Sequence, residues 1–264
     1  MNAPSSSTPV PPSSAHTTRP FKTEPFVAVP WERADLDSIV SRPFGIYLHV
    51  PFCTSRCGYC DFNTYALRTF PPGPAGDPIA HWAEQLTKEL RLGAQILTDH
   101  NITPPAANTV FFGGGTPSLL GRQLPKILDV VRECFGIAPG AEITSEANPE
   151  STSPELFDCW RAGGVNRLSL GMQSSEPRVL ALLDRQHDPA RAVAAIEEAQ
   201  AAGFEHLNLD LIYGTPGETT DDVARSVDTV LATGVDHVSA YALTIEPGTA
   251  LFRKVAHGEI DPID

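Results

Sequence analysis

The sequence has little positive charge, few cysteines and no long apolar run, and each shortage excludes a class of protein. Its 264 residues include 19 Lys and Arg against 32 Asp and Glu, which gives a net charge of −13. This acidic balance argues against nucleic acid or an anionic membrane surface as the main partner. No apolar run approaches the roughly 20 residues of a membrane-spanning helix, so no transmembrane segment is predicted.

Two further shortages concern the compartment. The first residues, MNAPSSSTPVPPSSAHTTRP, lack the apolar central run of a secretory signal. The five cysteines, three clustered and two isolated, do not resemble a secreted disulfide framework. We therefore expect a reducing, cytoplasmic location. Because the segment 1–40 is rich in Pro, Ser and Thr with little periodicity, we predict a disordered tail there.

The three clustered cysteines lie in the stretch YLHVPFCTSRCGYCDF, directly after a short apolar run. Cys53, Cys57 and Cys60 offer soft thiolates, which select zinc or iron–sulfur clusters, and their spacing lets one loop surround one metal centre. A closed zinc site or a fully ligated cubane needs four protein ligands, so three thiolates around a [4Fe–4S] cluster leave one iron open. The alternatives are a zinc knuckle with a remote fourth ligand, of which His49 is nearest, and an incidental group of cysteines.

Strand-like and helix-like segments alternate along the rest of the chain. Short apolar, β-branched or alternating runs predict strands at 44–50, 108–112, 142–146, 166–171, 206–212 and 237–243. Amphipathic patterns and capping residues predict helices between and after them, at 79–97, 124–135, 154–162, from 176, 189–203, 219–231 and 250–257. Such β–α repeats predict an α/β fold whose parallel sheet is connected by right-handed crossovers.

In parallel folds the chemistry gathers at the C-terminal ends of the strands. The cysteine loop follows the first predicted strand and the glycine loop 113–118 follows the second. Glu146 ends the third strand, and Gln173 lies just past the fourth. Glycines without side chains let the backbone approach a ligand, although a plain turn is the other interpretation. Because these features share one rim, we predict one composite site.

Two more polar residues are candidates for this site. Asp210 interrupts an apolar strand, where a buried carboxylate is costly unless it has a partner. Either the hydroxyls of a ribose or a structural arginine would serve as that partner. Glu146 and Gln173 have the same two interpretations, a ligand contact or a structural role. Arg185 would pair either with a ligand carboxylate or with surface acids on its own helix.

Several motifs together resemble a known family. The CxxxCxxC pattern at 53–60 resembles the cluster motif of the radical S-adenosylmethionine (SAM) enzymes. The likeness to the oxygen-independent coproporphyrinogen III oxidase family runs from about residue 45 to the end of the chain. It rests on Tyr47, GGGTPS at 113–118, EANPE around Glu146, LSLGMQS around Gln173, RQHD from Arg185, LDLIYGTPGET around Asp210 and LTIEPGT at 243–249.

This resemblance implies a partial (β/α)6 radical-SAM barrel over residues 41–250. It implies that the three clustered cysteines hold a [4Fe–4S] cluster whose open iron binds SAM. In that superfamily an electron from the reduced cluster cleaves SAM to methionine and a 5′-deoxyadenosyl radical, while the protein orients the reactants. The resemblance implies SAM contacts from Tyr47, Gly114, Gly115, Thr116, Glu146, Gln173, Arg185 and Asp210, and from the backbone of Ala242.

One position separates the two branches of the family. The decarboxylating oxidases resemble CxxxCxxCxC, whereas Asp61 and Phe62 follow Cys60 here. The CDF continuation resembles the HemW-like branch, proposed to bind haem and deliver it to haem proteins. This resemblance implies that haem or another tetrapyrrole is the ligand and that acceptor haem proteins are the partners. It also implies that the protein forms a homodimer. Oxidative decarboxylation of coproporphyrinogen III to protoporphyrinogen IX is the alternative function, and a zinc-stabilised non-catalytic module is the second.

HemW-like proteins also carry a C-terminal domain with an HNxxYW-type motif associated with haem. The sequence ends at Asp264, soon after the sixth predicted strand, and contains no such motif. We therefore expect residues 251–264 to be the start of a truncated C-terminal segment and the usual C-terminal domain to be absent. This expected absence argues against haem transfer by this chain alone.

Overall fold

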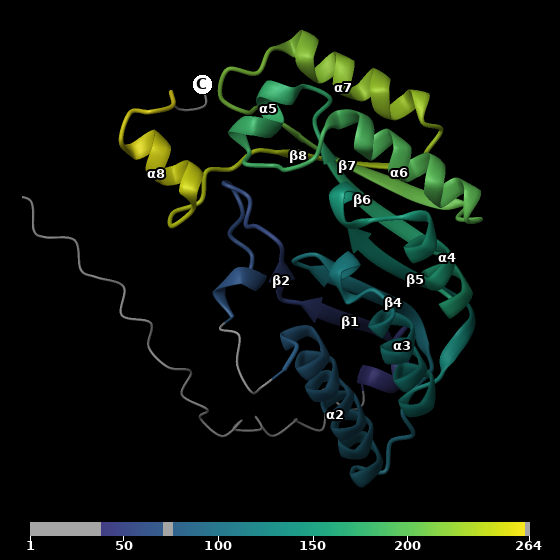
Figure 1. Cartoon of the computed structure of the whole chain (residues 1–264). Helices are drawn as coiled ribbons and strands as arrows, with labels where there is room; N and C mark the ends of the chain where they lie inside the picture. The colour runs from purple at the N-terminus through teal and green to yellow at the C-terminus, as the bar shows by residue number, and fades with distance from the viewer. Residues whose placement is uncertain (1–37, 71–75, 262–264) are drawn as a thin grey trace, which may run out of the picture.

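The computed structural model describes residues 38–70 and 76–261 (Figure 1). Most of the predicted disordered tail, 1–40, lies outside the described residues, and its last three residues belong to a helical turn at 38–41. Residues 262–264 of the predicted C-terminal segment also lie outside. Within the described part of the chain, no helix is both long and apolar enough to cross a membrane.

Six parallel strands form one curved sheet in the order β1-β4-β5-β6-β7-β8. Each strand of this sheet lies beside the one that precedes it in sequence, as expected when every crossover has the same hand. The six predicted strands are confirmed, with bounds shifted by a few residues. They are β1 (Gly45–Val50), β4 (Ala107–Gly114), β5 (Ile137–Ala147), β6 (Arg167–Gln173), β7 (His206–Tyr213) and β8 (His237–Ala242).

Most of the helices cover the convex side of this sheet, and the loop after β1 lies on the concave side (Figure 1). The predicted N-caps are confirmed: Asp188 accepts a hydrogen bond from the backbone N–H of Ala190 at 2.8 Å, and Thr219 and Asp222 form a capping box. The helices are α2 (Pro78–Asp99), α3 (Gln123–Cys134), α4 (Pro154–Gly163), α5 (Pro177–Leu182), α6 (Pro189–Ala201), α7 (Thr220–Ala232) and α8 (Ala250–Ala256).

A second, two-stranded sheet lies beside the end of β1 and was not predicted. Its strands, β2 (Phe52–Cys53) and β3 (Tyr65–Ala66), pair in parallel and enclose the loop that holds the other two clustered cysteines. Three short 3-10 turns follow strand ends: η1 (Leu67–Thr69), η2 (Pro117–Leu120) and η3 (Pro149–Ser151). Two-residue strands carry too little sequence pattern to be recognised in advance.

The two faces of the large sheet differ in character because successive side chains of a strand point to opposite sides. On β6, Leu168, Leu170 and Met172 are fully buried and join the hydrophobic core under the helices. On the same strand, Arg167, Ser169 and Gly171 line a cavity on the concave side. The convex face therefore builds the core, and the concave face is free for chemistry.

Candidate functional site

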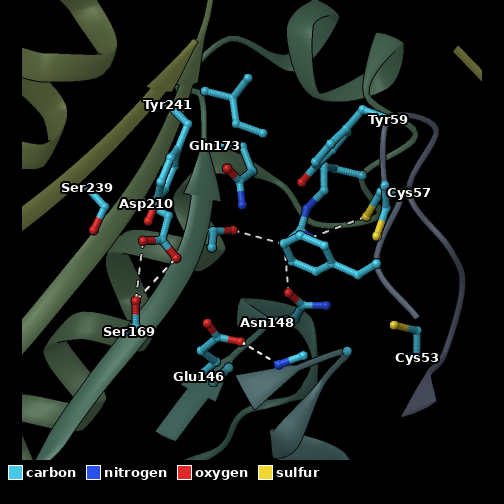
Figure 2. Close-up of a pocket in the computed structure, with 18 of the residues that line it drawn as sticks. Cys53, Cys57, Tyr59, Glu146, Asn148, Ser169, Gln173, Asp210, Ser239 and Tyr241 are labelled. Atoms are coloured by element: carbon cyan, nitrogen blue, oxygen red, sulfur yellow. Dashed lines mark hydrogen bonds between the residues drawn. The ribbon is translucent and has the colours of Figure 1, made fainter. Parts of the chain in front are cut away.

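A cavity of about 580 Å³ occupies the concave side of the sheet. Its wall includes Cys53, Cys57 and Cys60 from the loop after β1, together with residues from all later strands of the large sheet. Figure 2 shows this arrangement, with the cysteine loop on one side and the strand residues Glu146, Asp210 and Tyr241 on the other. The predicted composite rim is thus one continuous surface.

Backbone hydrogen bonds fix the start of the cysteine loop against the glycine loop. The N–H of Gly115 donates to the carbonyl of Val50 at 2.7 Å, and the N–H of Thr116 donates to the carbonyl of Phe52 at 2.7 Å. A Cβ atom on Gly115 would lie 2.5 Å from the Phe52 carbonyl oxygen, closer than any contact allows. Glycine is therefore needed here for the close approach of two backbones.

The tip of the cysteine loop is held from the other side. The N–H of Gly58 donates to the carbonyl of Leu183, after α5, at 3.0 Å. The carbonyl of Gly58 accepts from the N–H of Leu251, in α8, at 2.8 Å. Because both groups come from the C-terminal half of the described chain, the loop position depends on the whole fold rather than on local sequence.

The three thiols lie on one wall but are not packed around a point. Within residues 38–70 and 76–261, no three His, Cys, Asp or Glu side chains are close enough to hold a single metal ion. A cubane spreads its thiolate ligands over separate irons, so it suits a wider spacing than one zinc ion does. Burial raises the pKa of Cys53, and hydrogen bonds with Thr116 and Thr64 oppose that shift.

His49, the nearest candidate for a fourth ligand, has ordinary partners. Its Nδ1 lies 2.9 Å from the hydroxyl of Tyr47, and its Nε2 lies 2.9 Å from the carbonyl oxygen of Asn63. Both ring nitrogens are therefore engaged, and no nitrogen is left to ligate a metal in this arrangement.

Arg185 lies deep beside the cysteine loop. Its side chain is only 4 % exposed, and Nη1 donates to the thiol sulfur of Cys57 at 3.5 Å. Nη2 donates to the carbonyl of Gly171 at 2.9 Å, and the buried Nε has no hydrogen-bond partner among the described residues. Arg185 lies in the loop between α5 and α6 and not on a helix, so it has no acid of its own helix as partner, but its Nη2 lies 3.9 Å from Oε2 of Glu150.

Asn148 connects this arginine to the glycine loop, a role that the sequence did not reveal. Its Oδ1 accepts from Nη2 of Arg185 at 3.1 Å, and its Nδ2 donates to the hydroxyl of Thr116 at 3.2 Å. The only advance signal was its place directly after β5 in the EANPE motif. Thr116 itself is 2 % exposed and supports the wall from behind.

Glu146 faces the same cavity from the end of β5. One carboxylate oxygen accepts a hydrogen bond from the N–H of Gly114 at 3.0 Å. Burial raises the pKa of Glu146 to about 7, with a further increase from the negative charge of Asp210 and an opposing effect of the Gly114 hydrogen bond. A carboxyl poised near neutrality and facing a cavity is typical of functional sites.

Asp210 is held by neutral groups and not by a structural arginine. Asn208 Nδ2 donates to its carboxylate at 2.7 Å, and the hydroxyl of Ser169 donates at 3.2 Å. Burial raises the pKa of Asp210 while these hydrogen bonds oppose the rise. No described Arg or Lys forms an ion pair with this carboxylate, and Arg167 acts on it only from a longer distance, where its charge also opposes the rise in pKa.

Gln173 ends β6 in an unusual backbone conformation. Its φ is 67°, and the pairing of β6 with β7 shifts register between Gly171 and Gln173. Such an irregularity redirects a side chain, and in Figure 2 Gln173 points into the cavity. No sequence pattern indicated this irregularity, and the predicted strand ended at residue 171.

The predicted SAM contacts fall into two groups. Those that line the cavity are Gly114, Gly115, Glu146, Gln173, Arg185, Asp210 and Ala242. Tyr47 and Thr116 do not line it: Tyr47 is largely exposed and contacts His49, and Thr116 is buried and contacts Asn148. Burial, followed by the charge of Glu146, raises the pKa of Tyr47.

The donor set suits the groups that the sequence predicted. Three thiols share a wall with glycine backbone, and a buried guanidinium nitrogen without a partner lies beside one of them. Soft thiolates fit an iron–sulfur cluster, and the carboxylates and guanidinium fit the charged and hydroxyl groups of SAM. Tyr59, which lies between Cys57 and Cys60, is partly buried, and this burial raises its pKa.

Comparisons with known proteins point the same way. Residues 47–230 match the sequence profile of the Radical SAM superfamily. The heme chaperone HemW of Mycobacterium tuberculosis is 55 % identical over 236 residues, which are 89 % of this chain and 58 % of that protein. HemW of Escherichia coli is 36 % identical over 78 % of this chain and 52 % of its own length.

A solved structure has a similar fold at higher divergence. The coproporphyrinogen III oxidase HemN of Escherichia coli, described as a radical SAM enzyme, aligns with a TM-score of 0.73 and 28 % identity. The alignment covers 88 % of this chain and 52 % of that one. The chain thus spans about half the length of the curated relatives that it matches. With its cysteine loop, its sheet and this profile match, the chain belongs to the radical SAM superfamily.

Proposed function

We propose that this chain is the cluster- and SAM-binding part of a haem chaperone that resembles HemW. The observation that supports this most is that Cys53, Cys57 and Cys60 share one cavity wall with Glu146 and Arg185. The similarity to HemW of two organisms supports the chaperone assignment. The missing cysteine two positions after Cys60 supports the same branch.

Each group of residues has a distinct task in this proposal. The three thiolates hold a [4Fe–4S] cluster, which supplies the electron for cleaving SAM when it is reduced. The backbone around Gly114 and Gly115 approaches SAM closely because it carries no side chains. Arg185 and Asp210 orient the charged and hydroxyl ends of SAM, and the buried wall keeps water away.

The partners follow from the relatives. We expect haem or another tetrapyrrole to bind on the concave side, and acceptor haem proteins in the cytoplasm to receive haem. A homodimer is a further part of the proposal. Because the matched segment covers only 58 % and 52 % of these relatives, haem delivery belongs to the proposal for the whole protein and SAM binding to the proposal for this chain.

Electron paramagnetic resonance tests the central step. The chain is reconstituted with iron and sulfide without oxygen, reduced with dithionite, and measured at low temperature with and without SAM. We expect a reduced cubane signal that changes when SAM is added, because SAM binds the open iron. An Arg185→Gln variant should keep the cluster signal but require more SAM for the change. Stoichiometric zinc without a cluster signal would refute the proposal and favour a zinc-stabilised module.

One observation favours a second function, the oxygen-independent decarboxylation of coproporphyrinogen III. It is the likeness to the HemN structure, with a TM-score of 0.73. An anaerobic assay with coproporphyrinogen III, SAM and a reductant distinguishes the two functions. We expect no protoporphyrinogen IX, because Phe62 stands where the decarboxylating enzymes have their additional cysteine. Product formation would show that this cysteine is not needed.

A further inference from the structure

The end of the cavity away from the cysteines holds a cation without an assigned role. Arg167 begins β6 and lines the cavity, whereas Gln173 ends the same strand near the cysteine loop. Six residues of parallel strand separate them, about 20 Å at 3.3 Å per residue. Arg167 therefore lies at the end of β6 opposite the cysteine loop, although its positive charge still reaches Asp210, where it opposes the effect of burial on the pKa.

The guanidinium of Arg167 has unused hydrogen-bond donors. Its side chain is 16 % exposed, and among the described residues its one hydrogen bond runs from Nη2 to Nδ1 of His237. The nearest carboxylate oxygen, Oε2 of Glu142, lies 4.0 Å from Nε, beyond hydrogen-bond distance. Glu142 accepts instead from the hydroxyl of Thr144 at 2.8 Å. Since a guanidinium has five N–H donors, most of them remain for a ligand.

This contact also fixes the tautomer of the histidine. An arginine in a protein always donates, so Nδ1 of His237 accepts and the proton of a neutral ring lies on Nε2. His237 therefore offers a second N–H donor in the same part of the cavity wall. Tyr241, two positions beyond Ser239 on the same face of β8, adds a hydroxyl with no hydrogen-bond partner among the described residues.

The other charges of the cavity wall direct a ligand carboxylate toward Arg167. Among the described residues, only Arg167 and Arg185 bring a Lys or Arg side chain to the cavity wall, and Arg185 already bonds to Asn148, Gly171 and Cys57. The wall also carries acidic groups, and the chain has a net charge of −13. A ligand carboxylate is therefore repelled from most of the cavity and attracted to Arg167, which has several free donors, whereas Arg185 has only its Nε free.

We propose that Arg167 and His237 form a carboxylate subsite that binds a propionate of the tetrapyrrole ligand. This inference rests on the proposed function, because haem and its precursors carry propionates at the edge of a large apolar ring. Binding at Arg167 would place that edge far from the cysteine loop and the rest of the ring along the strands. The planar guanidinium fits a carboxylate with two parallel hydrogen bonds, which an ammonium group does not.

A comparison of an acid with its ester tests the subsite. Haem and haem dimethyl ester are titrated into the full chain and into Arg167→Gln, both reconstituted without oxygen, in one detergent-containing buffer. We expect Arg167→Gln to bind haem about 10-fold more weakly, because it loses a charge-assisted hydrogen bond to the propionate. It should bind the ester with the affinity of the wild type. Arg167→Lys should lie between, because it keeps the charge and loses the fork.

Arg91→Gln is the matched control, because Arg91 is 60 % exposed on α2 and pairs only with exposed Glu133 at 3.5 Å. It should leave both affinities unchanged. An equal change of haem and ester affinity in Arg167→Gln would mean that Arg167 supports the fold, and no change for haem would mean that it binds no propionate. Either result overturns this inference alone.

Failure of the proposed function looks different. The same titrations are repeated with coproporphyrin III and its tetramethyl ester, which cover a tetrapyrrole other than haem. If the wild type binds none of these compounds, the tetrapyrrole assignment and the subsite fall together. If it binds coproporphyrin III but not haem, with the loss in Arg167→Gln confined to the free acid, the subsite stands and the haem chaperone assignment falls.

Discussion

The two faces of the large sheet come from the same strands but follow different rules. On β7, Leu207, Leu209 and Leu211 are buried against the helices, whereas Asn208 and Asp210 line the cavity. On this strand the convex face loses nearly all contact with water and needs only apolar shape to be stable. The concave face keeps polar groups that must find partners among themselves. Neighbouring residues of one strand therefore have different tasks: one supports the core, and the next lines the cavity.

The concave face meets this demand with short chains of hydrogen bonds. Asn208 Nδ2 donates both to the carboxylate of Asp210 and to the hydroxyl of Ser169, each at 2.7 Å, and Ser239 donates to Asn208 Oδ1 at 3.2 Å. Even so, burial raises the pKa of Glu146 and of Asp210, so the ionised form of each carboxylate is disfavoured on this face. A bound ligand with donors for these carboxylates would relieve that cost.

The largest effect should come from the cysteine loop. Cys57→Ala removes one of three thiolates and should abolish the cluster, because the two remaining thiolates cannot hold it against exchange with solvent. The loss of stability should be small, since Cys57 is only partly buried. Iron and sulfide content after anaerobic reconstitution measures the effect. Cys159→Ala, on α4, is the matched control, and full iron content in Cys57→Ala would remove this residue from the ligand set.

A pair of neighbours on β6 tests the division between the faces directly. Leu170→Ala should lower the free energy of unfolding by about 3 kcal/mol, because it leaves a cavity in the fully buried core. Ser169→Ala should lower it by only about 1 kcal/mol, the net worth of a hydrogen bond. Urea unfolding of the cluster-free chain measures both. Equal losses would mean that the concave face contributes to stability as the core does.

The glycine loop gives a smaller and more local effect. Gly115→Ala should lower the free energy of unfolding by about 2 kcal/mol, because the new Cβ would overlap the carbonyl oxygens of Phe52 and Val50 at 2.5 and 2.9 Å. It should also weaken cluster binding, since the cysteine loop must move.

The control is Gly93→Ala in α2, where a Cβ meets only the ring of Phe135 at 3.8 Å. This change should stabilise the chain by about 0.5 kcal/mol, because alanine suits a helix interior better than glycine does. The same urea titration gives both numbers. A stable Gly115→Ala variant with full cluster content would show that the two backbones do not need to approach closely.

The sequence predicted those features of the two faces that depend on local pattern. Alternation placed the strands, and polar residues inside apolar strands marked Glu146 and Asp210. The contact of Arg185 with Cys57 joins positions 128 residues apart, so nothing in either neighbourhood could reveal it. Asn148 was missed for the same reason, because its role comes from lying between Thr116 and Arg185. The irregular end of β6 at Gln173 depends on pairing with β7, which is also a tertiary property.

The most subtle difference between the faces should appear in the pH dependence of stability. Burial raises the pKa of Glu146 from 4.5 to about 7, so the folded chain binds this proton more tightly than the unfolded chain does. Its contribution to stability is therefore complete below about pH 4.5 and is lost as the pH rises through 7. We expect the cluster-free wild type to lose about 3 kcal/mol from this group over that window.

Glu146→Gln removes the titration and keeps an oxygen that can accept from the N–H of Gly114. Its free energy of unfolding, measured by urea titration from pH 5 to 8, should therefore fall less with pH than that of the wild type. Glu84→Gln, an exposed change on α2, should leave the wild-type slope unaltered. If Glu146→Gln shows the wild-type slope as well, Glu146 is ionised at no cost in the folded chain. The concave face would then be as well solvated as the surface, and burial there would not prepare carboxylates for a ligand.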